Sequence, residues 1–145
     1  MPDAGLDSLH TSFQKEAWWK VSTNKRAGVL APLFSLRTRN TVGIADFSDL
    51  KMFIDWCLAT GNSIVQLLPM NEVGAANCPY DSISSFALEP MYCSLSEFSH
   101  LDFVKVRLGE LKNHYGGNTQ YVNYNFKNDK FDLLRQIFLA SRFTQ

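Results

Sequence analysis

Three acidic residues lie in or beside one long polar segment of the sequence. Glu72, Asp81 and Glu89 fall in or just after residues 69–86, a stretch rich in Asn, Ser, Gly and Pro. A pair of carboxylates can transfer a glycosyl group when one acts as nucleophile and the other as acid/base. Because any loop of this size holds an acid or two, residue type alone favours solvated surface acids.

Tyr80 is the most informative residue of this segment, because it follows Pro79 among small polar side chains. A tyrosine held in this way offers a flat apolar face with a polar tip, a surface on which sugar rings stack. The hydroxyls of Ser82, Ser84 and Ser85 follow closely enough to add hydrogen bonds to a sugar. A tyrosine that only packs the loop onto its domain explains the residue equally well, so both interpretations stay open.

Other chemistries lack the residues that they need. The histidines His10, His100 and His114 have no ligand or triad partner at a telling spacing, so we expect no metal site. Gly43 begins a Gly-Ile-Ala-Asp stretch, but no second glycine and no Lys-Ser/Thr pair follows it. This pattern argues against a phosphate-binding loop.

Composition and charge narrow the class of protein. The chain has 145 residues, and its 14 basic and 14 acidic side chains leave no net charge. This balance offers no basic surface for nucleic acid or an anionic membrane, and no apolar stretch approaches a membrane span. Cys57, Cys78 and Cys93 are an odd number at spacings that fit neither a disulfide framework nor a zinc site. We therefore predict a soluble cytoplasmic protein with reduced thiols, without nucleic-acid or membrane partners.

The elements that must position these residues are predicted to be a strand, a helix and a second strand. Residues 28–36 are an almost unbroken apolar run, typical of a strand covered on both faces, although Pro32 cannot donate to a sheet. Apolar residues at three- and four-residue spacing predict a helix over 47–60, with Asp46 as its N-cap. Residues 63–68 predict the second strand. The result is a βαβ unit with a parallel sheet and a right-handed crossover.

Residues 69–86 then form a long loop at the carboxyl end of the second strand, the edge where α/β folds bind their ligands. This loop is the candidate site. Beyond it, apolar spacing predicts helical stretches that stop at Gly116 and Gly117. A further amphipathic helix is predicted from Asp129 onward. Its apolar face is expected to hold Phe131, Leu134, Ile137, Phe138 and Ser141.

Several short motifs, taken in order, resemble one enzyme family. They are RAGVLAPLFSLR at 26–37, GIADF at 43–47, DL at 49–50, DW at 55–56, TG at 60–61, QLLP at 66–69 and CPYDSISSFALEP at 78–90. Together they resemble the N-terminal part of the 4-alpha-glucanotransferases (amylomaltases, disproportionating enzymes) of glycoside hydrolase family 77. The likeness runs from about Arg26 to Tyr92 without large gaps. Tyr124, followed by Lys130, Leu133 and Leu134, is a weaker echo of the family's next helix.

The resemblance implies a (β/α)8 barrel that cuts α-1,4-glucans and transfers the glycosyl part to glucose or another glucan with retention of configuration. It implies an aspartate nucleophile, a glutamate acid/base and a second aspartate. All three are expected beyond residue 145, so we assign no catalytic residue to this chain. No metal or organic cofactor is expected, and the expected substrates are maltooligosaccharides, α-1,4-glucan and glucose.

The resemblance also assigns substrate contact to the long loop. Tyr80 occupies the place of the family tyrosine that lies against the sugar at the cleavage point. The substrate-binding set is Tyr80, Pro79, Ser82 and Cys78. The chain departs from the family pattern at Cys78 and Asp81, where serine is common, and at Ala45, where glycine is usual. No hydroxyl contact is therefore expected from Cys78, and Asp81 receives no catalytic role.

Length sets the expected fold. A (β/α)8 barrel needs about 250 residues, so the α/β segment 26–145 is expected to form the N-terminal part of such a TIM barrel with the start of an inserted helical subdomain. Residues 1–25 are expected to be an N-terminal extension. A partial barrel exposes apolar strand edges, so this fragment is expected to be marginally stable or to self-associate. Because the catalytic acids are expected beyond residue 145, it is also expected to be inactive alone. The main alternative is a non-catalytic α/β module that binds α-glucan or a partner, and a flavodoxin-like domain ranks last.

Overall fold

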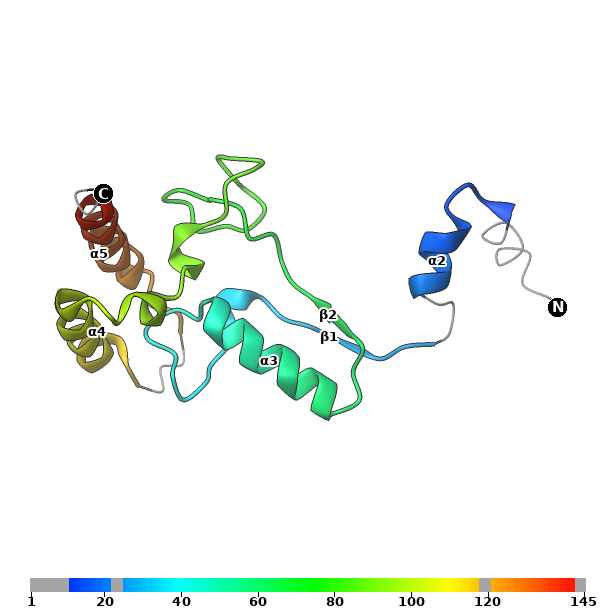
Figure 1. The fold of residues 1–145 in the computed structure, drawn as a ribbon, viewed down its shortest axis with the longest axis horizontal. Helices are drawn as coiled ribbons and strands as arrows, with labels where there is room; N and C mark the ends of the chain where they lie inside the picture. Colours follow the sequence, from blue (N-terminus) through cyan, green and yellow to red (C-terminus); the bar gives the residue numbers. More distant parts are fainter. Residues whose placement is uncertain (1–10, 22–24, 118–120, 143–145) are drawn as a thin grey trace.

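The computed structural model describes residues 11–21, 25–117 and 121–142. The elements in chain order are helix α2 (Lys15–Val21), strand β1 (Gly28–Leu30), 3-10 helix η1 (Leu33–Ser35), helix α3 (Phe47–Ala59), strand β2 (Ile64–Gln66), 3-10 helices η2 (Pro90–Tyr92) and η3 (Leu95–Phe98), and helices α4 (Asp102–Tyr115) and α5 (Asn125–Arg142). Figure 1 shows this small α/β arrangement, with the β1–α3–β2 unit in the middle and α4 and α5 together at one end.

Strands β1 and β2 pair in parallel, in register over three residues each, and α3 connects them. The predicted βαβ order and parallel direction are therefore confirmed. Backbone hydrogen bonds from Ser63 N to Ala27 O and from Ala31 N to Gln66 O, both 3.0 Å, extend the pairing at each end. The second strand is shorter than the predicted 63–68. Because the strands are parallel, their carboxyl ends meet at one edge, where η1 and the long loop begin.

Helix α3 begins where the sequence predicts. The Asp46 carboxylate accepts a hydrogen bond from Ser48 N at 2.8 Å, and the Asp49 carboxylate accepts one from Asp46 N at 3.0 Å. This reciprocal pair is a capping box. Beyond the other end, Gly61 has left-handed backbone with φ +80°, which stops the helix. The predicted span 47–60 is confirmed to within one residue.

The first strand is much shorter than the predicted run 28–36. It ends at Leu30, and Pro32, which has no N–H to donate, directly precedes η1. Gly28 and Leu30 are exposed, and only Val29 is half-buried. The expectation of a strand covered on both faces is therefore wrong for this chain, because two strands and one helix cannot enclose a sheet.

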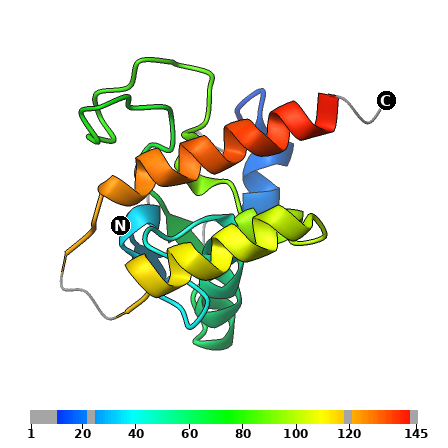
Figure 2. The ribbon, with the colours of Figure 1, turned by 90° about the vertical axis from the view of Figure 1, so that its left-hand side faces the viewer.

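Beyond the long loop, the described residues between 90 and 142 form one packed unit that we call the cap. Helices α4 and α5 run side by side in opposite directions (Figure 2), while η3 contacts α4 and η2 contacts α5. Most of the hydrophobic core lies in the cap. The buried core residues are Leu33, Ile44, Ala45, Met91, Tyr92, Leu95, Val104, Leu111, Phe126, Leu133 and Ile137.

Helix α5 begins at Asn125, four residues before its predicted start. Its buried residues are Phe126, Lys127, Lys130, Leu133 and Ile137. The predicted apolar face is rotated relative to this one, since Leu134 is only half-buried and Phe138 is exposed. Lys127 and Lys130 belong to the buried face because both ammonium groups lie beside carboxylates, a feature that the spacing of apolar residues does not indicate.

Helix α2 lies in the expected N-terminal extension, apart from the other elements (Figure 1). Residues 1–10 and 22–24 of that extension, His10 among them, lie outside the described residues. Within the described ranges, no helix is both long enough and apolar enough to cross a membrane.

Candidate functional site

The long loop between β2 and η2 occupies the predicted place. After Gln66 the chain leaves the carboxyl edge of the sheet and returns at η2 without forming another helix or paired strand (Figure 1). An antiparallel bridge between Asn71 and Leu88 closes its base. A backbone hydrogen bond from Glu72 N to Ala87 O at 3.0 Å reinforces the closure. The loop is thus a tied structure at the edge where α/β folds bind ligands.

The residues predicted to contact sugar sit on a tight turn of this loop. Asp81 N donates a hydrogen bond to Cys78 O at 3.0 Å, which closes the turn. Pro79, at the second position, fixes a backbone angle that such turns need. The preceding Asn77 has left-handed backbone with φ +51°. Tyr80 is 74% exposed, so in this chain its ring faces solvent and does not pack the loop onto the domain.

The other members of the predicted set lie beside Tyr80. Cys78 and Ser82 are exposed and Pro79 is half-buried. Ser84 has a different role, because its Oγ accepts hydrogen bonds from Phe86 N at 3.3 Å and Ala87 N at 2.9 Å. The structure therefore gathers Tyr80, Pro79, Ser82 and Cys78 into one accessible stretch, and it uses Ser84 to shape the loop.

Glu89 corrects the expectation of a solvated loop acid, because it is only 1% exposed. Its Oε2 accepts hydrogen bonds from Val73 N at 3.1 Å and from Lys127 Nζ at 2.9 Å, and its Oε1 accepts one from Met91 N at 3.5 Å. Lys127 Nζ also donates to Gly74 O at 2.6 Å. A buried carboxylate with these donors acts as a structural tie rather than as an acid/base.

The three loop acids do not form the carboxylate pair that glycosyl transfer needs. Asp81 is exposed and Glu72 is half-buried. Both oxygens of Glu89 are occupied by its donors, and none of the hydrogen bonds in the described ranges joins two of these carboxylates. The sequence did not identify Lys127 as a functional residue. The one feature that points to it is its position on the buried face of α5, directly after Phe126.

A second buried polar cluster lies at the start of α3. The Ser94 hydroxyl donates to Asp46 Oδ1 and accepts from Ser48 N, both at 2.9 Å. Lys130 Nζ lies 3.6 Å from Asp46 Oδ2. Burial lowers the pKa of the Lys130 ammonium, and Asp46 opposes the fall. Burial raises the pKa of the nearby Cys93 thiol, an effect that Lys130 opposes. This cluster joins η3 and α5 to α3.

Two tyrosines near the loop are held in their neutral form. Burial, and to a smaller degree Cys78, raises the pKa of Tyr124. Burial raises the pKa of Tyr92 far above its usual value, with smaller contributions from Glu89 and then Tyr124. Both phenols stay protonated near neutral pH, so neither is suited to act as a general base.

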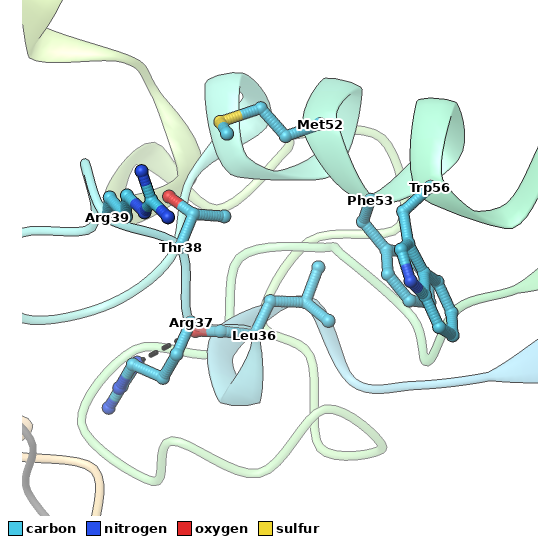
Figure 3. Close-up of a pocket in the computed structure, with 7 residues that line it drawn as sticks. All are labelled: Leu36, Arg37, Thr38, Arg39, Met52, Phe53 and Trp56. Carbon is cyan, nitrogen blue, oxygen red and sulfur yellow. Dashed lines mark hydrogen bonds between the residues drawn. The ribbon is translucent and has the colours of Figure 1, made fainter. Parts of the chain in front are cut away.

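A separate cavity of about 770 Å³ lies against α3 (Figure 3). Its lining residues are Leu36, Arg37, Thr38, Arg39, Met52, Phe53 and Trp56. The Phe53 and Trp56 rings stack with centroids 5.9 Å apart. In Figure 3 the Arg37 side chain points away from these rings, and its Nη1 donates to Leu36 O at 3.0 Å. Because Met52 and Trp56 are exposed, we interpret this cavity as open apolar surface of the βαβ unit.

The remaining candidates carry no site chemistry. In residues 11–21, 25–117 and 121–142, no group of three or more His, Cys, Asp or Glu side chains could hold a metal ion. His100 is exposed, and the His114 ring packs edge-on against Tyr115 with centroids 4.5 Å apart. None of the three cysteines, all of which are described, forms a disulfide.

Comparisons with known proteins match the segment that holds this loop. The family model for 4-alpha-glucanotransferases of glycoside hydrolase family 77 matches residues 31–145. A 4-alpha-glucanotransferase of Chlamydia pneumoniae is 39% identical over 84% of this chain and 24% of its own length. A 4-alpha-glucanotransferase of Chlamydia caviae is 37% identical over 92% of this chain and 26% of its own length. The 4-alpha-glucanotransferase DPE2 of Oryza sativa subsp. japonica is 40% identical over 50% of this chain and 8% of its own length. The chain thus spans about a quarter of the length of the bacterial relatives.

Proposed function

This chain belongs to glycoside hydrolase family 77, the family of 4-alpha-glucanotransferases, and from that premise we propose that it supplies a sugar-binding loop of an enzyme that transfers α-1,4-glucan segments. The donor is a maltooligosaccharide, and the acceptor is glucose or another glucan. The carboxylates that break and form the glycosidic bond lie outside these 145 residues. Residues 69–86 form part of the donor-side wall of the site.

One observation carries this proposal. Tyr80 presents an exposed ring on a proline-fixed turn, in the loop that leaves the carboxyl edge of a parallel strand pair. Sugar rings stack their C–H faces on such aromatic faces, while neighbouring polar groups bond the hydroxyls. Pro79 stiffens the turn, Ser82 offers a hydroxyl, and Cys78 offers a weakly polar thiol beside the ring. These four residues are the proposed substrate contacts.

The exposed surfaces of the βαβ unit support a larger fold around it. We infer that residues 26–145 are the N-terminal part of a (β/α)8 barrel with the start of an inserted helical subdomain, preceded by an extension over 1–25. Leu30 on β1 and Ile64 on β2 are exposed apolar side chains that further strands and helices would cover. Without that cover the same surfaces favour self-association of the chain.

The unpaired thiols are consistent with a reducing compartment, and we propose a cytoplasmic location on that ground. No metal or organic cofactor is part of the proposal, because retaining glycosyl transfer is carried out by carboxylates alone.

The proposal is tested by adding maltoheptaose to the purified chain and following the backbone amide signals of residues 69–86 by NMR, which every variant retains. We expect saturable shifts of these signals. Tyr80→Ala should raise the Kd about tenfold, because a tenfold change corresponds to about 1.4 kcal/mol, the free energy of one good aromatic stack. Tyr121→Ala is the matched control, because Tyr121 is an equally exposed tyrosine, 77% accessible, outside the loop. Equal affinity of Tyr80→Ala and the unsubstituted chain would contradict the assignment.

A second assay tests whether this chain is active alone. The chain should form no glucose from maltotriose, because it lacks the catalytic acids, and glucose formation would disprove that assignment. Size-exclusion chromatography of the same sample then distinguishes the remaining alternatives. Oligomers or aggregates fit a partial barrel, whereas a compact monomer that binds glucan fits a free-standing non-catalytic module.

A further inference from the structure

Helix α5 reaches the long loop through one side chain that is distant in sequence. Lys127 Nζ donates to Gly74 O at 2.6 Å and to Glu89 Oε2 at 2.9 Å. Gly74 and Glu89 lie on opposite arms of the loop, one before the Tyr80 turn and one after it. A single ammonium group therefore bridges the two arms, and we call the Glu89–Lys127 pair the clamp.

The clamp is shielded from water. The side chain of Lys127 is 8% exposed and that of Glu89 is fully buried. Salt therefore screens this pair much less than a surface pair, and loss of one partner leaves an unpaired buried charge. The Lys127 ammonium also lies 5.6 Å from the centre of the Phe131 ring, one turn further along α5. These contacts give the ammonium a defined position on the helix.

The clamp holds the loop close to its most constrained backbone. Val73 N donates to the Glu89 carboxylate at 3.1 Å, and the next residue, Gly74, has left-handed backbone with φ +56°. Asn77, also left-handed, follows directly before the Tyr80 turn. The other arm is tied back by Ile83 N, which donates to Glu72 O at 2.8 Å. The path from Gly74 to Tyr80 thus begins at a fixed point.

We propose that Lys127 is a positioning residue, which holds the Tyr80 turn in place for an α-glucan by bridging Gly74 and Glu89. This inference rests on the proposed function, because it takes Tyr80 as the sugar contact. It makes α5, in the cap, a part of the binding site although α5 itself touches no sugar. The position of α5 then determines how well the loop receives its ligand.

The test compares three lysine substitutions in the chain. Lys127→Met keeps the length of the side chain and removes its donors. Lys130→Met is the structural comparator, because Lys130 is buried on the same helix and its ion-pair partner is Asp46, outside the loop. Lys105→Met, at an exposed position of α4, is the surface control. If Lys127→Met alone does not fold, the double variant Glu89→Gln/Lys127→Met removes the unpaired charge and keeps an acceptor for Val73 N.

Two readouts are measured on each folded variant: amide hydrogen exchange of residues 70–77 relative to α3, and the Kd for maltoheptaose. Lys127→Met or the double variant should exchange about tenfold faster at residues 70–77 with α3 unchanged, and its Kd should rise about tenfold. Lys130→Met should not accelerate this segment selectively, and Lys105→Met should change neither readout.

The inference is overturned if exchange at residues 70–77 stays at its original rate without the clamp, or if it rises while the Kd is unchanged. It is also overturned if Lys130→Met gives the same selective pattern, since general destabilisation then explains both effects. Failure of the unsubstituted chain to bind maltoheptaose would instead contradict the proposed function. The exchange data would still decide whether Lys127 holds the loop.

Discussion

The βαβ unit and the cap differ in how much of their apolar surface they bury. In the βαβ unit, large apolar residues face solvent on the sheet and on α3, among them Leu30, Ile54, Trp56, Leu58 and Ile64. In the cap, the buried apolar side chains of η2, η3, α4 and α5 pack into one continuous core. The strands and helix that the sequence predicts most clearly therefore lie in the region that buries less of its apolar surface.

Buried charged groups link the two regions. The cap buries charged groups beside partners, as with Lys130 near Asp46 and Lys127 on Glu89. Each of these pairs joins the cap to the rest of the chain, either to the start of α3 or to the long loop. The βαβ unit therefore depends on the cap for order at its carboxyl edge, whereas its opposite surfaces remain uncovered.

The largest expected effect on stability is at the contact between the two regions, where Gly43 packs against Phe126 of the cap. Gly43 has left-handed backbone with φ +67°, and an added Cβ would lie 2.4 Å from Phe126 Cγ. Gly43→Ala should therefore lower the free energy of unfolding by about 4 kcal/mol, through backbone strain and overpacking. Gly109→Ala, in α4 with open space around it, should raise it by about 0.5 kcal/mol. Urea titration followed by circular dichroism measures both, and similar values would contradict the packing at this contact.

The next effect compares one leucine from each region. Leu133 in the cap is 1% exposed, whereas Leu58 on α3 is 74% exposed. Leu133→Ala should cost about 3 kcal/mol of unfolding free energy because it leaves a cavity. Leu58→Ala should change stability by less than about 0.5 kcal/mol. A large loss at Leu58 would mean that a partner surface already covers the βαβ unit in solution.

A smaller effect is expected at the hydroxyl that links η3 to the start of α3. Ser94→Ala removes the bond to Asp46 Oδ1 and one acceptor of Ser48 N, so it should cost about 1 kcal/mol in thermal or urea unfolding. Ser96→Ala, at an exposed position of the same 3-10 helix, is the control and should be nearly neutral. Equal stability of the two variants would show that the link between the regions does not depend on Ser94.

The smallest effect concerns the slope of stability against pH. The folded chain raises the pKa of Tyr92 far above that of an exposed tyrosine, chiefly by burial. The folded state therefore holds a proton that the unfolded state releases near pH 10, and stability falls as pH rises above that value. Tyr92→Phe cannot titrate, so its stability should fall less steeply between pH 9.5 and about pH 11. Urea midpoints across this range check it, and parallel slopes would contradict the effect of burial.

The sequence predicts local features well where short-range rules decide them. Asp46 and Asp49 provide a capping box, and the spacing of apolar residues in α3 gives its span almost to the residue. The long loop and its place at the sheet edge are confirmed too, because Pro69 and a change in composition mark its start.

The sequence could not predict features that depend on distant partners. From sequence alone Glu89 is interpreted as a surface acid, because its partner Lys127 is 38 residues away along the chain. The buried face of α5 is likewise misplaced, because it includes two lysines whose acidic partners lie far away in sequence. An apolar run such as residues 28–36 predicts a strand covered on both faces, but no element among the described residues covers both faces of β1. Burial of a charge depends on the ion pair, and one local stretch of sequence does not contain the pair.

The contacts at the start of helix α3 determine the order in which parts of this chain can fold during translation. The Asp46 carboxylate is bonded by Ser94, 48 residues later, and lies beside Lys130, which is later still. Because a nascent chain emerges from its N-terminus, α3 can coil early but cannot acquire these two contacts until α5 has left the exit tunnel. Until that point the start of α3 lacks the two contacts that tie it to η3 and α5. The start of α3 is therefore completed only after the last helix of the chain has been synthesised, although α3 itself forms among the first elements.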